Sequence, residues 1–368
     1  MRVTFVVPSL GFSGGQRVCA TYAGALAAQG HEVTVVSPSP SPMAMRHRVR
    51  RWLRGDGWVP RRGARPSHFD GLPIRMRVLD EHRPVTDADV PDADVVIATF
   101  WATAEWVAAY GPSKGVKCYL IQHDETVMAN QPAERVEATW RLPMRRLAVS
   151  QWIADRIHAK ADVPVTVIPN GVDTSQFDAP PRGRQAVPTV GLIWSHEAWK
   201  GSDVSASASA AVRAERSEVA VVGFGHLRAT HPLFTEPGVR YEANPPQRRI
   251  AALYASCDVW LSASRAEGFG LPVLEAMACR TPVIATPTGA APQLVADGGG
   301  ILVPHDDAPA MAEAIKRVLA MDDASWRAMS DRAYATAKAW SWDAATRRFE
   351  QELLAASGAS SAPIAVAV

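Results

Sequence analysis

The sequence has almost no net charge, few cysteines and no long apolar run, and each lack excludes a class of protein. Lys and Arg number 39 against 37 Asp and Glu, a formal charge of +2, so global charge indicates no nucleic-acid partner. The apolar run over 3–7 is too short for a secretory signal, and nothing approaches the roughly 20 apolar residues of a membrane-spanning helix. We expect a cytoplasmic protein whose scattered cysteines are reduced, buried and without metal-ligand spacing: Cys19, Cys118, Cys257 and Cys279.

The length of 368 residues predicts two domains of ordinary size. In the first, apolar runs over 3–7 and 33–36 flank residues 16–29, where apolar side chains recur at helical spacing. This strand–helix–strand order predicts an α/β domain of the Rossmann-like, doubly wound kind. Further strands are expected over 95–99, 118–122, 147–150 and 165–169.

The Gly-x-Gly-x-x-Gly dinucleotide fingerprint is also absent from the loop after the first strand. This loop has only Gly14 and Gly15. They either form a tight turn or let a ligand approach the backbone closely. The local sequence favours neither alternative.

A run rich in proline over 178–188 separates a second α/β domain from the first. Its strands are expected over 189–194, 219–223, 239–243, 258–264, 282–285 and 300–303. We therefore predict a first domain over 1–179, a linker over 180–188, a second domain over 189–340, a last helix over 341–356 and a disordered tail over 357–368.

The most informative stretch is Ser264–Glu275, where a buried strand is expected to end in a glycine turn and a helix. Gly268 and Gly270 interrupt regular structure, and Pro272 suits the first position of a helix. The backbone N–H groups just before and at the start of that helix would form an anion site. They belong to Phe269, Gly270 and Leu271.

Two carboxylates bracket this anion site, Glu267 on the loop and Glu275 one turn into the helix. Taken singly, Glu275 is best interpreted as a solvated helix residue and Glu267 as a charge favoured by the helix dipole. Together they favour a ligand that carries hydroxyls beside its phosphates, because carboxylates accept paired hydrogen bonds from sugar diols. The combination predicts a nucleotide-sugar site.

These residues resemble the Glu-x7-Glu motif of the retaining glycosyltransferases of family 4, which have the GT-B fold of two Rossmann-like domains facing across a cleft. The similarity extends to the run from Gly14 to Arg17 and to the run from Pro169 to Asp173. In the family the first of these loops faces the acceptor and the diphosphate, which implies that Gly14 and Gly15 bind the donor. It implies an acceptor-side N-terminal domain, a donor-side C-terminal domain and a last helix that crosses back to the first domain. It also implies that Glu267 lies near the donor sugar, that Glu275 holds the ribose and that the 269–271 amides bind the diphosphate.

The implied activity is retaining transfer of a hexosyl or deoxyhexosyl group from a nucleotide diphosphate sugar to a hydroxyl acceptor. The acceptor would be sugar- or lipid-linked, in glycan or polysaccharide assembly such as that of bacterial surfaces. We expect no cofactor and no metal, because a lysine and a helix N-terminus would do the work of a cation. No Asp-x-Asp follows a strand at the expected cleft.

The resemblance also assigns His123 and Lys200. His123 follows a strand end, where the family has a histidine that contacts the donor sugar; the adjacent Asp124 and Glu125 could orient it or compete with it. Lys200 precedes Gly201 and a helix, where it could place a point charge on a phosphate. The family pairs this lysine with an arginine on the diphosphate. Leu192 stands in the arginine's place here, and His196 and Arg265 are the candidate second cations.

A segment over 43–66 departs from the α/β pattern and is rich in arginine, opposed only by Asp56. One interpretation is a solvated surface insertion. The other is a patch for an anionic membrane surface or acceptor, because Trp52 and Trp58 are interleaved with the cations and could anchor at the interface. This second alternative predicts peripheral contact with the inner face of the cell membrane. The arginines are Arg46, Arg48, Arg50, Arg51, Arg54, Arg61, Arg62 and Arg65.

Two other functional classes are considered. A glycoside hydrolase would also use paired carboxylates, but it has no use for Lys200 or for a phosphate-binding helix end. A non-catalytic protein that binds nucleotide sugars is favoured by Leu192. It is opposed by the presence of Glu267, Glu275, Lys200 and His123. Transfer is therefore the preferred prediction.

Overall fold

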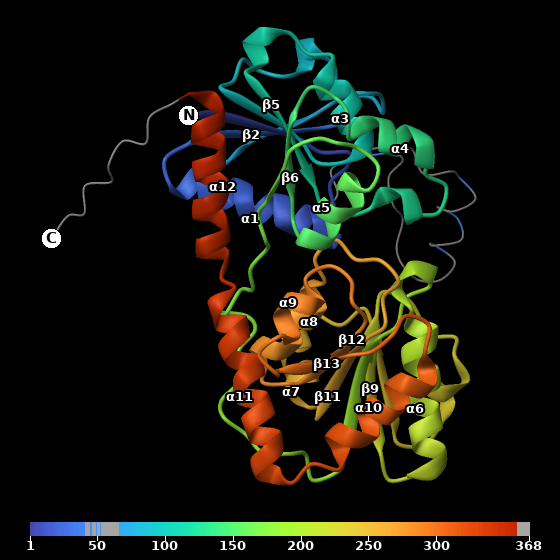
Figure 1. The fold of residues 1–368 in the computed structure, drawn as a ribbon. Coiled ribbons are helices and arrows are strands. Elements are labelled where there is room, and N and C mark those ends of the chain that lie inside the picture. The colour runs from blue at the N-terminus through green and yellow to red at the C-terminus, as the bar shows by residue number, and fades with distance from the viewer. Residues whose placement is uncertain (41–44, 46–48, 50–51, 53–65, 359–368) are drawn as a thin grey trace, which may run out of the picture.

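The computed structural model describes residues 1–40, 45, 49, 52 and 66–358. They form two α/β domains, one above the other in Figure 1, each built on a parallel sheet covered by helices. The N-terminal sheet has seven strands in the order β3-β2-β1-β4-β5-β6-β7, and the C-terminal sheet has six in the order β10-β9-β8-β11-β12-β13. This confirms the predicted fold class of two doubly wound, Rossmann-like domains.

The N-terminal domain alternates strands and helices as its apolar runs predict. Its strands are β1 (Arg2–Val6), β2 (Glu32–Ser37), β3 (Arg75–Val78), β4 (Val95–Ala98), β5 (Val116–Ile121), β6 (Arg145–Ala148) and β7 (Val165–Val167). Its helices include α1 (Gly14–Ala28), α3 (Trp101–Ala108), α4 (Ala133–Thr139) and α5 (Gln151–His158).

The C-terminal domain follows the same plan. Its strands are β8 (Thr189–Ile193), β9 (Ala220–Gly225), β10 (Val239–Ala243), β11 (Val259–Ser262), β12 (Val283–Ala285) and β13 (Gly300–Leu302). Its helices are α6 (Ser202–Glu215), α7 (Gln247–Ala255), α8 (Leu271–Ala278), α9 (Ala291–Val295), α10 (Ala308–Leu319) and α11 (Asp323–Ala339).

Most strands are continuous apolar runs because both faces of a parallel sheet are covered. The edge strands β3 and β10 are exceptions, because each alternates charged with apolar residues, and β3 is also absent from the sequence prediction. Within the described residues β3 lies at the edge of the sheet and pairs only with β2, and all four of its side chains are exposed. Two of its four residues, Arg75 and Arg77, are charged, so no apolar run marks it.

The chain crosses between the domains twice, and the crossings lie side by side. After Trp340 the chain leaves α11 on the C-terminal domain and continues as α12 (Trp342–Ser357), which packs on the N-terminal domain (Figure 1). There Phe349 stacks on Tyr22 of α1 at a centroid distance of 4.2 Å, and both side chains are fully buried. A parallel bridge pairs Val172 of the first crossing with Ser341 of the second.

The segment predicted as a linker, 180–188, lies against the C-terminal domain. The Arg182 guanidinium donates to the carbonyl of Cys257 at 2.6 Å and to the Thr281 hydroxyl at 2.9 Å. Arg184 donates to the carbonyl of Leu319 at 2.7 Å.

All four cysteines are unpaired and buried, as predicted, and burial raises the pKa of each thiol to about 12. Within the described ranges, no helix combines the length and apolarity needed to cross a membrane.

Candidate functional site

The glycine loop between β11 and α8 packs against the N-terminal domain. A Cβ atom on Gly268 would collide with the carbonyl oxygen of Gln122, which precedes His123. The Ser150 hydroxyl donates to the carbonyl of Gly268 at 2.5 Å. The loop therefore sits directly on the carboxyl ends of β5 and β6, where open α/β sheets bind ligands.

Helix α8 begins at Leu271, with Gly270 as its cap at a φ of 91°. The sequence predicted Pro272 as the first residue of this helix, but the structure makes it the second. The first N–H groups of an α-helix have no partner within the helix. The amides that the sequence assigns to a diphosphate thus lie at the helix end that faces the N-terminal domain.

Lys200 and Glu267, 67 residues apart in the chain, form an ion pair at this loop. The Lys200 Nζ lies 2.6 Å from Glu267 Oε1, and the Ser264 hydroxyl donates to the same oxygen at 2.8 Å. Gly201 permits the contact, because any Cβ there would collide with the carbonyl of Ala263 at the end of β11. The structure thus brings together the predicted phosphate cation and the predicted sugar carboxylate.

His123 reaches this pair from the N-terminal domain. Its ring meets the Trp199 ring edge to face, with centroids 4.5 Å apart, and the Lys200 ammonium lies 4.2 Å from the centre of the same tryptophan. Its Nδ1 donates to the carbonyl of Asp124 at 2.9 Å. Its Nε2 is buried with no hydrogen-bond partner among the described residues. Burial lowers the pKa of His123, so the neutral ring presents an acceptor lone pair at Nε2.

The carboxylates beside His123 neither orient its ring nor compete with it. Asp124 accepts from Arg156 at 2.8 Å and from the Thr126 hydroxyl at 2.5 Å. Glu125 accepts from the backbone N–H of Trp101 at 2.9 Å, and burial raises the pKa of Glu125 to about 8. Both side chains therefore hold the N-terminal domain together, and only the Asp124 carbonyl orients the imidazole.

Glu275 is 6% exposed and is held from both domains. One carboxylate oxygen forms an ion pair with Arg17 of α1, and the other accepts from the Tyr254 hydroxyl at 2.9 Å. The Glu275 charge raises the pKa of the Arg17 guanidinium. A cavity of about 510 Å³, bordered by Asp173 and Ser341 at the crossings, opens onto this pair.

Arg17 and Tyr254 have no individual role in the sequence analysis. The sequence did contain a signal for Arg17. It lies in the first turn of α1, where a cation opposes the helix dipole unless an anion compensates its charge. The sequence contained no such signal for Tyr254, because nothing in the sequence around it distinguishes it from an aromatic residue of the core. Gly14 and Gly15 form the start of α1, and Gly15 adjoins the Gln122 side chain.

The two candidate second cations have other partners. Arg265 bonds with Asp306 at 2.6 Å, with Asp203 at 3.0 Å and with the carbonyl of Ala198. The His196 Nε2 lies 3.2 Å from the carbonyl of Arg228. Leu192, in the family arginine's position, is fully buried in β8. The described residues contain no cluster of three or more possible metal ligands.

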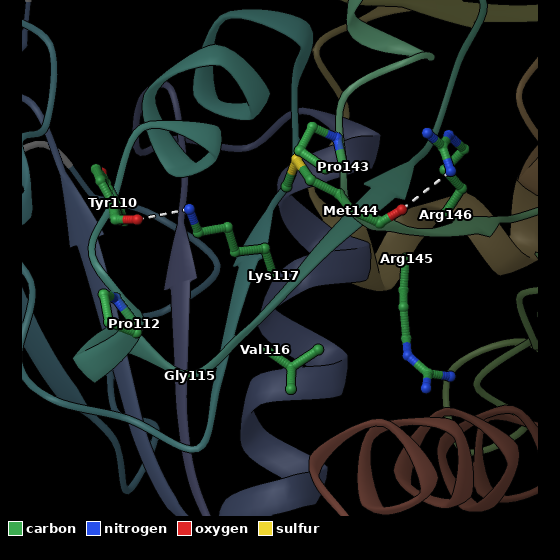
Figure 2. Close-up of a pocket in the computed structure, with 9 residues that line it drawn as sticks. All are labelled: Tyr110, Pro112, Gly115, Val116, Lys117, Pro143, Met144, Arg145 and Arg146. Carbon is green, nitrogen blue, oxygen red and sulfur yellow. Dashed lines mark hydrogen bonds between the residues drawn. The ribbon is translucent and has the colours of Figure 1, made fainter.

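Figure 2 shows a cavity of about 630 Å³ at the opposite ends of β5 and β6 from the cleft. Two of its three cations are already engaged, and the third, Arg145, is exposed with no ion pair or hydrogen bond among the described residues. Lys117 donates to the carbonyl of Tyr110 at 2.5 Å, and Arg146 to the carbonyl of Met144 at 3.0 Å. We assign no function to this cavity.

Comparison with known proteins agrees with this geometry. Residues 12–176 match the family described as Glycosyltransferase Family 4, and residues 184–321 match Glycosyl transferases group 1. Among curated relatives, the O-antigen chain mannosyltransferase B of Escherichia coli is 35% identical over 112 residues, 30% of this chain and 29% of that protein. The lipopolysaccharide core biosynthesis mannosyltransferase LpcC of Rhizobium leguminosarum bv. viciae is 29% identical over 198 residues, 48% of this chain and 56% of that protein. These matches span about a third to a half of the relatives' length.

Solved structures share the whole fold. Sucrose-phosphate synthase from Thermosynechococcus elongatus superposes with a TM-score of 0.74 at 18% identity, covering 98% of this chain and 100% of that one. Anabaena Alr3699/HepE in complex with UDP-glucose superposes with a TM-score of 0.70 at 16% identity, covering 96% and 100%. The two family matches together cover both domains and place this chain in the group 1, family 4 glycosyltransferases, and the solved structures share its GT-B fold.

Proposed function

We propose that this protein is a retaining glycosyltransferase that moves a hexosyl or deoxyhexosyl group from a nucleotide diphosphate sugar to a hydroxyl acceptor. The observation that carries the proposal is the meeting of Lys200, Glu267 and His123 at the N-terminus of α8. The curated relatives support a role in glycan assembly, since two of them are mannosyltransferases of lipopolysaccharide or O-antigen. The HepE complex supports a nucleotide diphosphate sugar as donor.

In the proposed reaction, the bond between the anomeric carbon and the diphosphate breaks, and a bond from that carbon to the acceptor oxygen forms on the same face. The departing diphosphate takes the proton of the acceptor hydroxyl, so no protein nucleophile is required. Lys200 and the first amides of α8 stabilise the charge that grows on the diphosphate. Glu267 and the His123 Nε2 accept hydrogen bonds from sugar hydroxyls and orient the ring. Neither a metal nor a cofactor is needed in this scheme.

The test is release of UDP, GDP or TDP from a panel of nucleotide sugars. We expect release from at least one donor, increased by a saccharide acceptor. Binding of a nucleotide sugar without any release would favour the alternative, a non-catalytic sugar-nucleotide-binding protein. Hydrolysis of simple glycosides without nucleotide involvement would favour a hydrolase.

The proposed ribose site at Glu275 gives a direct prediction. Glu275→Gln keeps the size of the side chain and its contact with Tyr254 but loses its charge. Hydrogen bonds to a charged group contribute about 1.5–3 kcal/mol each, so the donor KM should rise at least about tenfold. Steady-state kinetics measures this, with circular dichroism as the check of folding. An unchanged donor KM in a folded variant would remove Glu275 from the ribose site.

We also propose that the arginine-rich segment 46–65 contacts an anionic membrane surface or acceptor. Its arginines lie outside the described residues. The described Trp52 is 58% exposed, as an interfacial anchor requires. Eight arginines minus Asp56 leave seven positive charges, and each contributes about 1 kcal/mol near an anionic leaflet.

This contact predicts clear co-sedimentation with anionic vesicles at low salt and weak co-sedimentation at high salt, because salt screens the attraction. Replacing Arg46, Arg48, Arg50 and Arg51 by serine should abolish it while nucleotide binding stays intact. If the wild-type protein ignores anionic vesicles at low salt, the segment is a solvated insertion or an acceptor site.

A further inference from the structure

Arg17 lies between the N-terminal ends of two helices that belong to different domains. It is in the first turn of α1, and its ion-pair partner Glu275 is four residues after Leu271, where α8 begins. At about 1.5 Å per residue, Glu275 is about 6 Å along the helix from Leu271. Helix side chains lean toward the helix N-terminus, so the Glu275 carboxylate lies over the first turn of α8. The ion pair therefore forms close to the amides proposed to bind the diphosphate.

The guanidinium of Arg17 has unused hydrogen-bond donors. Its Nη2 bonds with Glu275, and its Nε and Nη1 have no acceptor in the part of the chain that the structure describes. The side chain is 26% exposed and lines the cavity of about 510 Å³ at the crossings. The planar fork of N–H donors on an arginine suits phosphate oxygens. A ligand in this cavity can therefore reach the free donors of Arg17.

The proposed donor site needs more positive charge than Lys200 supplies. The Lys200 ammonium is already paired with Glu267, and Glu275 adds a further negative charge on α8. Arg265 is held by two aspartates on the far side of its loop. A diphosphate carries several negative charges and gains charge as it leaves. Arg17 is placed to balance them, because it already contacts α8.

Glu275 has to exchange one partner before it can bind a ribose. It is 6% exposed, with Arg17 on one carboxylate oxygen and the fully buried Tyr254 on the other. Arg17 is the partner on the cavity side, so a ribose hydroxyl that donates to Glu275 takes its place.

We infer that the ribose of the donor takes over Glu275 and that the displaced Arg17 guanidinium binds the diphosphate. This inference rests on the proposed glycosyl transfer and adds a donor-binding residue from the N-terminal domain. The nucleotide would then replace a direct bond between the domains by one that passes through its phosphates. Donor binding and domain contact are coupled in this way.

The test separates the phosphates of the nucleotide from its nucleoside. Calorimetry with UDP, GDP and TDP identifies which diphosphate binds the full wild-type chain, and titration by saturation-transfer NMR gives the affinity of the matching nucleoside. Arg17→Met should lower the affinity for the diphosphate about tenfold or more, because bonds to a charged group are lost. It should leave the affinity for the nucleoside unchanged or raise it, because Arg17 no longer competes for Glu275.

Two further variants serve as controls. Arg17→Lys keeps the charge without the planar fork, so it should retain more affinity for the diphosphate than Arg17→Met. Arg2→Met also removes an arginine from an ion pair of the N-terminal domain, with Asp94, but at the start of β1 and so at the opposite end of that strand from α1. It should change neither affinity.

An equal fall of both affinities in the Arg17 variants would overturn the inference, because Arg17 would then only hold the domains together. An unchanged affinity for the diphosphate would also overturn it. If circular dichroism shows that Arg17→Met does not fold, the comparison of Glu275→Gln with the double variant Arg17→Met, Glu275→Gln decides, since neither leaves an unpaired Glu275 charge. The double variant should lose affinity for the diphosphate alone. A wild-type chain that binds none of the three diphosphates would instead refute the proposed function, and the inference with it.

Discussion

Replacing Lys200 by alanine is expected to lower kcat by about 10²–10³, the scale of losing one preorganised electrostatic donor. The diphosphate gains charge as it leaves, so the lysine acts mainly on the transition state and the donor KM should change less than kcat. Among the described residues, Lys200 is the only cation that contacts Glu267, which is 8% exposed and would keep only Ser264 as a partner after the substitution. Stopped assays of nucleotide release measure both constants.

Lys200→Arg is the matched control, since it keeps the charge but not the compact ammonium, and it should retain more activity than Lys200→Ala. EDTA or added Mg²⁺ should change the wild-type rate little. Strict dependence on a divalent metal would contradict the mechanism, because the lysine and the helix end would then not suffice to stabilise the diphosphate.

Arg17→Met is expected to lower the free energy of unfolding by about 3 kcal/mol, the lower end of the range for removing one partner of a buried ion pair. Glu275 would remain buried, and the Tyr254 hydroxyl would be its only remaining partner in the described part of the chain. The cost falls at the lower end because Arg17 and Glu275 belong to different domains, so opening of the cleft can bring water to the carboxylate. Urea unfolding, followed by tryptophan fluorescence, measures the change.

The double variant Arg17→Met, Glu275→Gln is the decisive control for this pair. A neutral glutamine does not need the guanidinium, so the double variant should regain much of the stability lost in Arg17→Met. Residues in contact give such non-additive effects, whereas independent sites add. If the two losses simply add, the ion pair does not couple the domains.

Local sequence was sufficient for most of the fold because a parallel sheet covered on both faces requires apolar runs. It failed at β3, where an exposed edge strand of alternating arginines needs no apolar face. The glycine loop was predicted from its local pattern, and Lys200 and His123 were predicted from the family resemblance together with their places beside strand and helix ends. Their side chains lie close together in the structure, although no sequence pattern indicates these contacts.

Contacts between distant residues were beyond the sequence. Arg17 and Glu275 are 258 residues apart, and no periodicity or motif relates them. Arg265 was a reasonable candidate for a second cation, but its direction depends on Asp203 and Asp306, which belong to other loops. Tertiary packing determines which acidic side chain pairs with each cation.

Helix α12 gives the molecule an unusual order of assembly. The core of the N-terminal domain contains Phe349 and Leu353, which stack and pack on residues near the beginning of the chain. During synthesis a ribosome must therefore produce the entire second domain before Phe349 can stack on Tyr22. Domains usually fold one after another as they emerge, but here the core of the first domain is completed only after the second domain has been synthesised. A nascent chain stalled at 340 should expose Tyr22 and Phe5 to chaperones, and release of α12 would complete both the core of the first domain and the bridge between the two crossings in one step.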